Sequence, residues 1–314
     1  MKIIFMGTPD FATPTLRALI EHHYELQAVV TQPDREKGRG KQIIAPPVKL
    51  LAVQCHIPVL QPEKVRSQEM VHTLREFDPD VIIVVAYGQI LPESILQIPS
   101  HGCINVHASL LPKYRGAAPI HWAILRGETE TGVTTMFMDK GMDTGDMLLQ
   151  RTLPIQEDDT AGTLHDKLAE LGAQTLLDTL QHLETGSLQR LPQNHDAATY
   201  APMLKKEDGE IHWQESAATI ARKVRGLYPW PGAFTTYQGC MVKLLKVQQE
   251  SCPAALSASI PGTVIDMNKF SGPLVSTGGG CLRILQIQPQ NKSPMNCSDF
   301  CRGYHLTIGD HLGI

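Results

Sequence analysis

Several features that would assign a function directly are missing from this chain of 314 residues. No stretch reaches the ~18 consecutive apolar residues that a membrane-spanning helix needs. The apolar run at residues 1–7 is short and acidic Asp10 follows it, so we expect a first strand there rather than a signal peptide. The sequence also lacks Cys-x-x-Cys, His-Glu-x-x-His, Gly-x-x-x-x-Gly-Lys-Ser/Thr and Gly-x-Ser-x-Gly. These absences argue against zinc ribbons, zincins, P-loop nucleotidases and α/β-hydrolases, and we expect no metal ion.

Charge of one sign is not in excess either. The 28 Lys+Arg and 32 Asp+Glu give a formal net charge of −4, and 42% of residues are hydrophobic, enough for a folded core. The total gives no overall indication of a nucleic-acid partner. From residue 206 onward, however, we count ten Lys+Arg against eight Asp+Glu, so this part is mildly basic while the remainder is acidic.

The seven cysteines are odd in number and scattered along the chain. Nothing in their spacing indicates a disulfide framework or a metal site. We therefore expect all seven to be reduced thiols, as in an ordinary cytoplasmic protein.

The first half of the chain alternates between strand-like and helical patterns. We predict strands at residues 2–6, 26–31, 80–86, 103–107, 132–138 and 147–155, and helices at residues 118–126 and 160–184. A further helix follows Asp10, which we expect to be its N-cap. This alternation predicts an α/β domain with a doubly wound, Rossmann-like sheet. The first βα turn, at Gly7, lacks the further glycines of a dinucleotide-binding fingerprint, so we do not expect NAD binding there.

The pattern changes after the long helix. Residues 186–202 are polar, contain two prolines and show no periodicity, as expected of a linker. Short strands with intervening turns are predicted at residues 233–237, 241–247, 262–266, 274–277 and 281–287, which suits a small OB-like β-barrel. We therefore expect a catalytic domain at residues 1–189, a linker at 190–205 and a second domain at 206–314.

The strongest local signal for chemistry is the pair Asn105 and His107. They are two apart on a predicted strand, so both side chains face the same side, near the carboxyl end where open α/β sheets place their active sites. An amide donor beside an imidazole can stabilise an oxyanion and move protons. The same pattern also fits a strand end with two polar residues that face solvent.

Two loops are further candidates. Residues 139–146 carry three acids and two glycines between two predicted strands. A hairpin connection is the simplest interpretation, and an acid presented by this loop could instead orient His107. Residues 33–46 contain four basic side chains within seven positions, a pattern suited to a phosphate backbone and equally to a solvated surface loop. These four are Arg35, Lys37, Arg39 and Lys41.

At these residues the sequence closely resembles the bacterial methionyl-tRNA formyltransferases, a branch of the 10-formyltetrahydrofolate-dependent formyltransferase family. The matching motifs are Gly7-Thr8-Pro9-Asp10-Phe11, Thr31-Gln32-Pro33-Asp34-Arg35 with Gly38-Arg39-Gly40-Lys41, Val84-Val85-Ala86-Tyr87-Gly88, Ile104-Asn105-Val106-His107-x-Ser109-Leu110-Leu111-Pro112, Arg115-Gly116-Ala117-Ala118-Pro119-Ile120, Met138-Asp139-x-Gly-x-Asp143-Thr-Gly-Asp146 and Pro229-Trp230-Pro231-Gly232. The segment at Asn105–Pro112 with the distant Asp143 is shared by the whole family, whereas the basic loop and the C-terminal barrel indicate the tRNA-dependent branch.

The resemblance implies formyl transfer from 10-formyltetrahydrofolate to the α-amine of methionine on initiator tRNA. It assigns catalysis to Asn105, His107 and Asp143. Four residues become the folate segment: Ser109, Leu110, Leu111 and Pro112. Five become tRNA contacts, with Arg39 the key member: Arg35, Lys37, Arg39, Lys41 and Lys206. We also expect a cytoplasmic enzyme that needs no metal. The sequence leaves the oligomeric state open, with a monomer as the simplest expectation.

The sequence departs from the family pattern at His212 and at residues 301–305, away from the expected chemistry. Two other functions are compatible with parts of the pattern. A formyltransferase that acts on an amino-sugar nucleotide would keep Asn105, His107 and Asp143 but would not need the basic loop. A non-catalytic folate- or RNA-binding module would tolerate the loss of His107.

Overall fold

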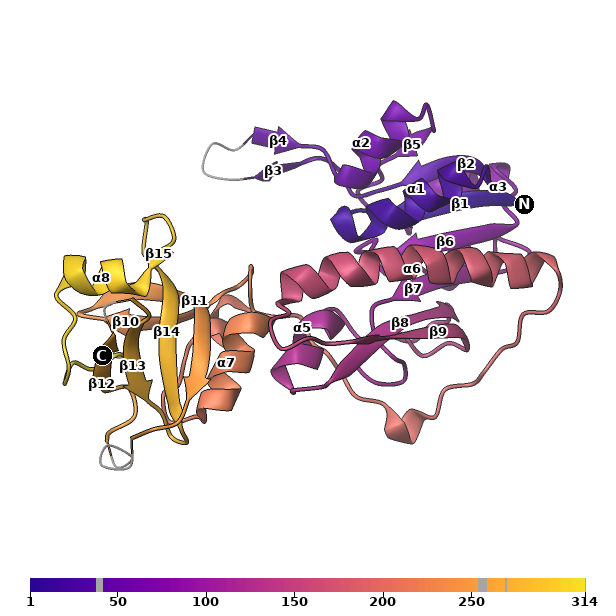
Figure 1. Ribbon diagram of the computed structural model, residues 1–314. Helices are drawn as coiled ribbons and strands as arrows, with labels where there is room; N and C mark the ends of the chain where they lie inside the picture. The colour runs from indigo at the N-terminus through magenta and orange to yellow at the C-terminus, as the bar shows by residue number, and fades with distance from the viewer. Residues whose placement is uncertain (38–41, 254–258, 269, 314) are drawn as a thin grey trace. The chain divides into compact units, whose positions relative to one another are not determined.

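The computed structural model describes residues 1–37, 42–253, 259–268 and 270–313, and of Lys37 only the backbone (Figure 1). The chain divides into two compact units, each built from several stretches. The first comprises Met1–Pro119, Glu130–Pro154 and His165–Ala201, and the second comprises Ile120–Thr129, Ile155–Leu164 and Pro202–Ile314. In the described residues, no helix is long and apolar enough to cross a membrane.

A seven-stranded mixed sheet forms the centre of the first unit, with the strand order β5-β2-β1-β6-β7-β8-β9. The strands are β1 (Lys2–Gly7), β2 (Glu25–Val30), β5 (Val59–Leu60), β6 (Val81–Val85), β7 (Cys103–His107), β8 (Glu130–Phe137) and β9 (Met147–Pro154). Strands β5, β2, β1, β6 and β7 run parallel, while β8 and β9 are antiparallel to their neighbours. The expected α/β sheet is thus confirmed, with an antiparallel pair at one edge.

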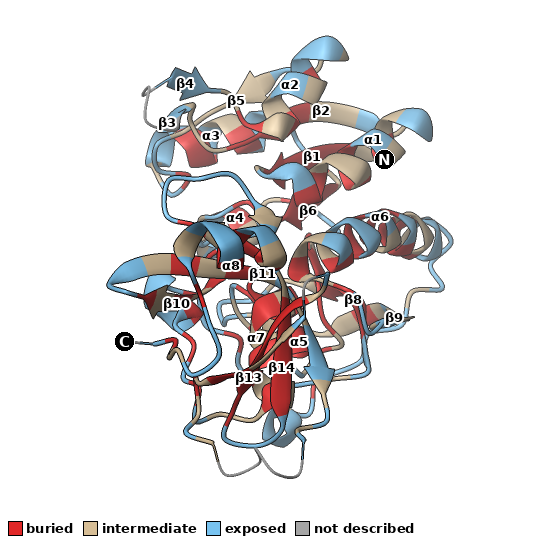
Figure 2. Cartoon of the chain, turned by 60° about the vertical axis from the view of Figure 1, so that its left-hand side comes forward, coloured by how far each residue is buried: buried red, intermediate tan, exposed pale blue. Residues whose placement is uncertain are grey.

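Helices cover this sheet. They are α1 (Thr13–Glu21), α2 (Pro47–Gln54), α3 (Gln68–Glu76), α4 (Glu93–Leu96) and most of α6 (Ala161–Glu184). Helix α5 (Pro119–Leu125) belongs to the second unit from Ile120 onward. Helix α6 runs along the sheet face in Figure 1, and Gly172 allows a close approach, because a Cβ there would lie 3.0 Å from Val106 Cγ1. All five residues of β6 are buried, as expected for a parallel strand covered on both faces (Figure 2).

The start of α1 differs from the sequence prediction. Asp10 opens a 3₁₀ turn (η1, Asp10–Ala12), and the α-helix begins only at Thr13. The N-cap of α1 is Ala12, whose side chain cannot accept a hydrogen bond. Pro14 lies in the first turn and has no N–H to be capped, so the helix begins there without a polar cap.

The basic segment also differs from the predicted continuous loop. Its ends pair as a two-stranded hairpin, β3 (Arg35–Lys37) and β4 (Gln42–Ile44), which extends away from the main sheet (Figure 1). Polar residues fill β3 without alternation, so its sequence gave no strand signal.

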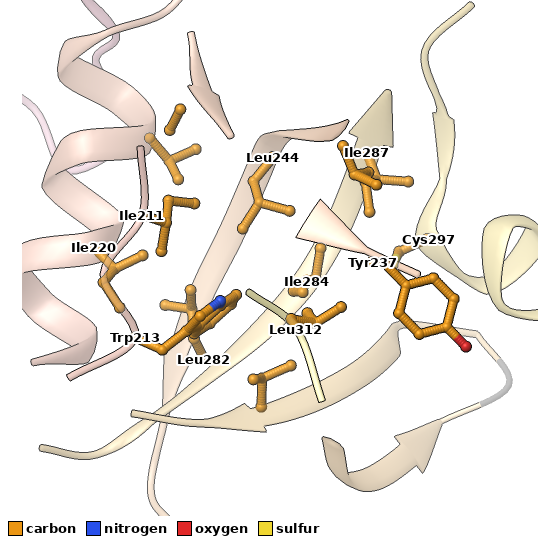
Figure 3. Close-up of a cluster of buried hydrophobic side chains, with 14 of the residues drawn as sticks. Ile211, Trp213, Ile220, Tyr237, Leu244, Leu282, Ile284, Ile287, Cys297 and Leu312 are labelled. Carbon is orange, nitrogen blue, oxygen red and sulfur yellow. The ribbon is translucent and has the colours of Figure 1, made fainter. Parts of the chain in front are cut away.

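The second unit contains an antiparallel sheet in the order β10-β11-β14-β13-β12, with β15 paired to β14. The strands are β10 (Ala233–Tyr237), β11 (Cys240–Glu250), β12 (Val264–Asn268), β13 (Gly272–Ser276), β14 (Cys281–Pro289) and β15 (Met295–Asn296), and the helices are α7 (Ala217–Gly226) and α8 (Cys297–Tyr304). Apolar side chains from these elements converge on one core around Trp213, Leu244 and Ile284 (Figure 3). The buried indole N–H of Trp213 donates to Thr235 Oγ1 over 3.0 Å, so its polar atom is satisfied.

The prediction that all seven cysteines are reduced thiols is wrong. Cys252 and Cys281 form a disulfide, with their Cα atoms 5.2 Å apart. The cause is strand pairing: Glu250, at the end of β11, lies opposite Cys281, the first residue of β14. The chain therefore brings Cys252 beside Cys281 across 29 residues of sequence, a proximity that cysteine spacing alone does not reveal.

Candidate active site

Strand β7 carries the two residues singled out from the sequence. It lies between β6, to which it is parallel, and the antiparallel β8. Val106 faces α6, so the alternating geometry of a strand directs Asn105 and His107 to the opposite face. His107 is the last residue of β7, at the carboxyl end of the parallel strands.

The imidazole of His107 is buried, and each of its nitrogens faces a different oxygen. Its side chain is 7% exposed, and its Nε2 lies 3.0 Å from the carbonyl oxygen of Tyr114. A carbonyl oxygen can only accept, so Nε2 carries a proton and donates. The other ring nitrogen, Nδ1, lies 3.7 Å from Asp143 Oδ2. Nε2 therefore faces a backbone carbonyl, and Nδ1 is the ring nitrogen nearest the carboxylate.

Asp143 reaches His107 from the loop between β8 and β9. Its Oδ2 accepts a hydrogen bond of 2.7 Å from the backbone N–H of Gly116, and its side chain is 15% exposed. Its own backbone is left-handed, with a φ of 53° that is uncommon outside glycine. Gly116 is left-handed too, and a Cβ there would lie 2.8 Å from the carbonyl oxygen of Ala201, so this position requires glycine.

Asn105 is half-buried on the same face. Among the residues that the structure describes, no hydrogen bond to its side-chain amide is present, in contrast to His107 and Asp143. Its two N–H groups are therefore available to a ligand. Asn105 lies two residues before His107 on the strand.

Residues 109–112, which lie just beyond β7, are held in place by hydrogen bonds with Lys113, Thr134 and Gln150. The hydroxyl of Ser109 donates to the carbonyl of Lys113 over 2.7 Å, and it is fully buried. The N–H of Leu111 donates to Thr134 Oγ1, and the carbonyl of Leu111 accepts from Gln150. Leu110 and Pro112 are half-buried, and the Leu111–Pro112 peptide bond is cis. The segment is thus a rigid support directly after His107.

The neighbouring strand ends meet at Tyr87, just after β6. Its backbone carbonyl accepts from Thr8 Oγ1 over 2.9 Å and from Gln32 Nε2 over 3.2 Å. The Tyr87 hydroxyl is buried without a hydrogen-bond partner among the described residues, and burial raises the pKa of Tyr87 to about 12. These hydrogen bonds join the three segments that follow β1, β2 and β6.

Some of the predicted tRNA contacts can be placed. Arg35 is exposed on β3, with Nη2 3.3 Å from Glu63 Oε2, and Lys206 is exposed in the 3₁₀ turn η3 (Lys206–Gly209). Arg39 and Lys41 lie outside the described residues, as does the side chain of Lys37. The structure therefore places the side chains of two of these five residues, Arg35 and Lys206.

The root of the hairpin is fixed by Asp34, which precedes β3. Its carboxylate accepts from Gln61 Nε2 over 2.7 Å and from Lys49 Nζ over 2.7 Å. The hydrogen bond from Gln61 is the largest cause that lowers the pKa of Asp34 below its ordinary value, and the hydrogen bond from Lys49 is the next.

Sequence reasoning missed the residues that hold His107 and Asp143. Tyr114, Gly116 and Gln193 contact one or the other, and Gln193 lies fifty positions beyond Asp143. No spacing rule connects such distant positions, and Gly116 entered the sequence analysis only as part of a family motif, without a role. No group of three or more histidines, cysteines or acids in the described chain is placed to hold a metal ion.

Comparison with known proteins identifies the family to which the chain is similar. The family described as formyl transferase matches residues 1–180, and its C-terminal domain matches residues 203–305. The chain is 52% identical over 313 residues to the methionyl-tRNA formyltransferase of Geobacter metallireducens, covering 100% of this chain and 99% of the relative. It is 53% identical over 314 residues to that of Desulforamulus reducens, covering 100% and 98%. Among solved structures, HypX from Aquifex aeolicus in complex with tetrahydrofolic acid has a TM-score of 0.63 at 18% identity, over 99% of this chain and 48% of that one, a similarity of fold.

Proposed function

The chain belongs to the methionyl-tRNA formyltransferase family, and from this membership we propose that it transfers the formyl group of 10-formyltetrahydrofolate to the α-amino group of methionine on initiator tRNA. The observation that carries the proposal is the cluster of Asn105, His107 and Asp143, which lies within the matched formyl transferase region. Formyl transfer to an amine builds negative charge on the formyl oxygen and requires a proton to leave the attacking nitrogen. The cluster offers a group for each need.

Asn105 stabilises the oxygen. Its side-chain amide donates hydrogen bonds to the formyl oxygen as the amine attacks the carbon and the C=O bond gains single-bond character. An uncharged donor suits this role because it stays bonded throughout without changing protonation. The available N–H groups of Asn105 and its place beside His107 on one face of β7 support this assignment.

His107 and Asp143 manage charge and protons. With Nε2–H committed to the Tyr114 carbonyl, a proton exchanges at Nδ1, and the imidazolium that results is paired with the Asp143 carboxylate 3.7 Å away. This pairing keeps the cationic ring stable, so Nδ1–H can donate toward the reacting centre. In the complete reaction the amine loses a proton, the new N–C bond forms, and the bond to folate N10 breaks as that nitrogen takes up a proton.

Residues 109–112 line the folate site in this proposal. Ser109, Leu110, Leu111 and Pro112 begin two residues after His107, and the backbone of Leu111 is hydrogen-bonded to Thr134 and Gln150. A rigid wall next to the imidazole would hold the formyl carbon at a fixed distance from the catalytic groups.

The tRNA contacts come from the basic hairpin and the second unit. Arg35, Lys37, Arg39 and Lys41 form one set, with Arg39 the most important, and Lys206 adds a contact near the end of the predicted linker. The exposure of Arg35 and Lys206 supports this, since phosphate contacts require accessible cations. Asp34, held by Gln61 and Lys49, would anchor the hairpin while its tip engages RNA.

The remaining assignments complete the proposal. In this proposal residues 1–189 are the catalytic domain and residues 190–205 the linker. Residues 206–314 form an OB-like barrel that binds tRNA. Its five-strand antiparallel path and the buried core around Trp213 support the barrel assignment. We place the enzyme in the cytoplasm, since aminoacylated tRNA is its substrate. We also propose that it acts as a monomer and needs no metal ion.

The direct test supplies 10-formyltetrahydrofolate and charged initiator tRNA and follows formyl-methionine after release from the tRNA. Product should appear only when both substrates and the enzyme are present. Absence of product with reagents that a known formyltransferase uses would refute the proposed function. Formylation of an amino-sugar nucleotide under the same conditions, without formylation of the tRNA, would instead identify the sugar-directed activity.

The tRNA assignment is tested with Arg39→Ala. We expect this variant to raise KM for the charged tRNA by about tenfold while KM for folate stays within about twofold. Arg17→Ala, which removes an equal charge from an exposed position on α1, is the matched control and should change neither value. Equal effects on both substrates in Arg39→Ala would contradict an RNA-facing hairpin.

A further inference from the structure

The predicted linker enters the catalytic unit, and one of its side chains is buried against the Asp143 loop. Gln193 is 6% exposed. Its Nε2 donates to the backbone carbonyl of Asp143 over 2.9 Å and to that of Gly145 over 2.8 Å. One amide group thus binds the loop on both sides of Thr144. This contact is not what a flexible connection between domains would provide.

Arg115 determines which way the Gln193 amide faces. Its Nε and Nη2 donate to Gln193 Oε1 over 3.1 Å and 2.6 Å, and the guanidinium is almost fully buried. A guanidinium can only donate, so the amide oxygen must face Arg115 and the NH₂ group must face the Asp143 loop. Arg115 also contacts Nδ1 of His195, further along the same segment.

The same segment holds the stretch that contacts both His107 and Asp143. The backbone N–H of Arg115 donates to the carbonyl of Thr199 over 2.9 Å, and the N–H of Ala201 donates to the carbonyl of Arg115 over 2.7 Å. Arg115 lies between Tyr114, which accepts from the imidazole, and Gly116, which donates to the carboxylate. Residues 193–201 therefore hold the support of both functional groups.

We infer that Gln193, oriented by Arg115, is a positioning residue that holds the Asp143 loop so that its carboxylate faces His107. This inference rests on the proposed formyl transfer. Asp143 has a left-handed backbone, which a residue with a side chain adopts at a cost unless its surroundings hold it there. The two hydrogen bonds from Gln193 to the carbonyls of this loop supply that hold. Gln193 does not touch the reacting atoms, so its effect passes through Asp143.

The test uses Gln193→Glu in the full-length enzyme. Glutamate keeps the length and the acceptor for Arg115 but has no N–H for the carbonyls of Asp143 and Gly145. We expect kcat for Met-tRNA formylation to fall by about tenfold or more, with KM for folate and for tRNA within about threefold of wild type. Gln193→Met, which removes both interactions at similar volume, should lose at least as much and replaces the glutamate variant if that does not fold.

Asn194→Ala is the matched control, because this neighbouring exposed side chain caps the 3₁₀ turn η2 (His195–Ala197) through Asp196 and does not reach the loop. It should keep the wild-type kcat. A smaller fall of kcat in a folded Gln193 variant, or a fall matched by a rise in KM, would overturn the inference. Because wild type is assayed alongside, failure of the proposed function would show as inactive wild type, whereas failure of this inference would show as active variants.

Discussion

The pairing of Asp143 with His107 makes a quantitative prediction for Asp143→Asn. Asparagine has nearly the same size, and its carbonyl can still accept from the Gly116 N–H, so the loop geometry should survive. What is lost is the negative charge 3.7 Å from Nδ1 of the imidazole. The variant therefore tests electrostatic support of an imidazolium separately from folding.

Coulomb's law sets the size of the effect. Two unit charges about 4 Å apart interact with about 1 kcal/mol in water and about 4 kcal/mol at an effective dielectric constant of about 20. The two side chains are only 7% and 15% exposed, which places the pair toward the upper value. A loss of about 2 to 4 kcal/mol in the transition state corresponds to a fall in kcat of about 30- to 1,000-fold.

The assay measures kcat and KM for Met-tRNA formylation, together with thermal unfolding to establish that the variant is folded. Asp166→Asn is the matched control, since Asp166 also contacts a histidine, His165, but is exposed on α6. It should leave kcat within about twofold, as surface pairs contribute little. A folded Asp143→Asn enzyme with less than about a fivefold loss of kcat would refute the idea that the carboxylate stabilises a charged imidazole.

Three further predictions follow from the same structure. Asn105→Ala should lower kcat by about 10²- to 10³-fold with little change in KM, because it removes an oxyanion donor, and a loss below about tenfold in steady-state assays would contradict that role. Burial raises the pKa of the Cys103 thiol to about 12, so iodoacetamide at pH 8 should label exposed Cys240 and leave Cys103 unmodified by peptide mass spectrometry until the protein unfolds. Asp34→Asn should destabilise the fold in urea titrations at pH 7. Because Gln61 lowers the pKa of Asp34 in the folded state, this difference should be constant above the ordinary pKa and shrink as pH falls below about 4 through the lowered value; a difference that grows in acid would contradict this.

The sequence located the centre of the sheet well because its strands have strong signals. The bounds of β7 match the predicted residues 103–107, and β6 differs from its prediction by one residue at each end. These segments are apolar and bounded by polar turns. Strand β5 was missed because it has only two residues, and its pairing depends on contacts such as that of the Thr31 N–H with the Leu60 carbonyl.

The candidate site was only partly accessible from sequence. Asn105 and His107 could be paired through the two-residue period of a strand, a local rule. That an acid of the 139–146 loop orients His107 was one of two interpretations, and only the family resemblance pointed to Asp143. The left-handed backbone of Asp143 was not foreseen. The contacts of Gln193 and Arg115 span 78 positions, and no pattern in composition or periodicity encodes a hydrogen bond over that separation.

The interleaving of the two units changes how a truncated chain should be interpreted. Ile120–Thr129 belongs to the second unit, where Ile124 and Leu125 contact the backbone position of Gly226 on α7. A fragment that stops in the predicted linker would keep these two side chains and lose the helix that covers them. Its inactivity would then report exposed apolar surface and local unfolding as much as the loss of an RNA-binding domain. For this chain, point substitutions separate the roles of the two units, whereas deletions confound them.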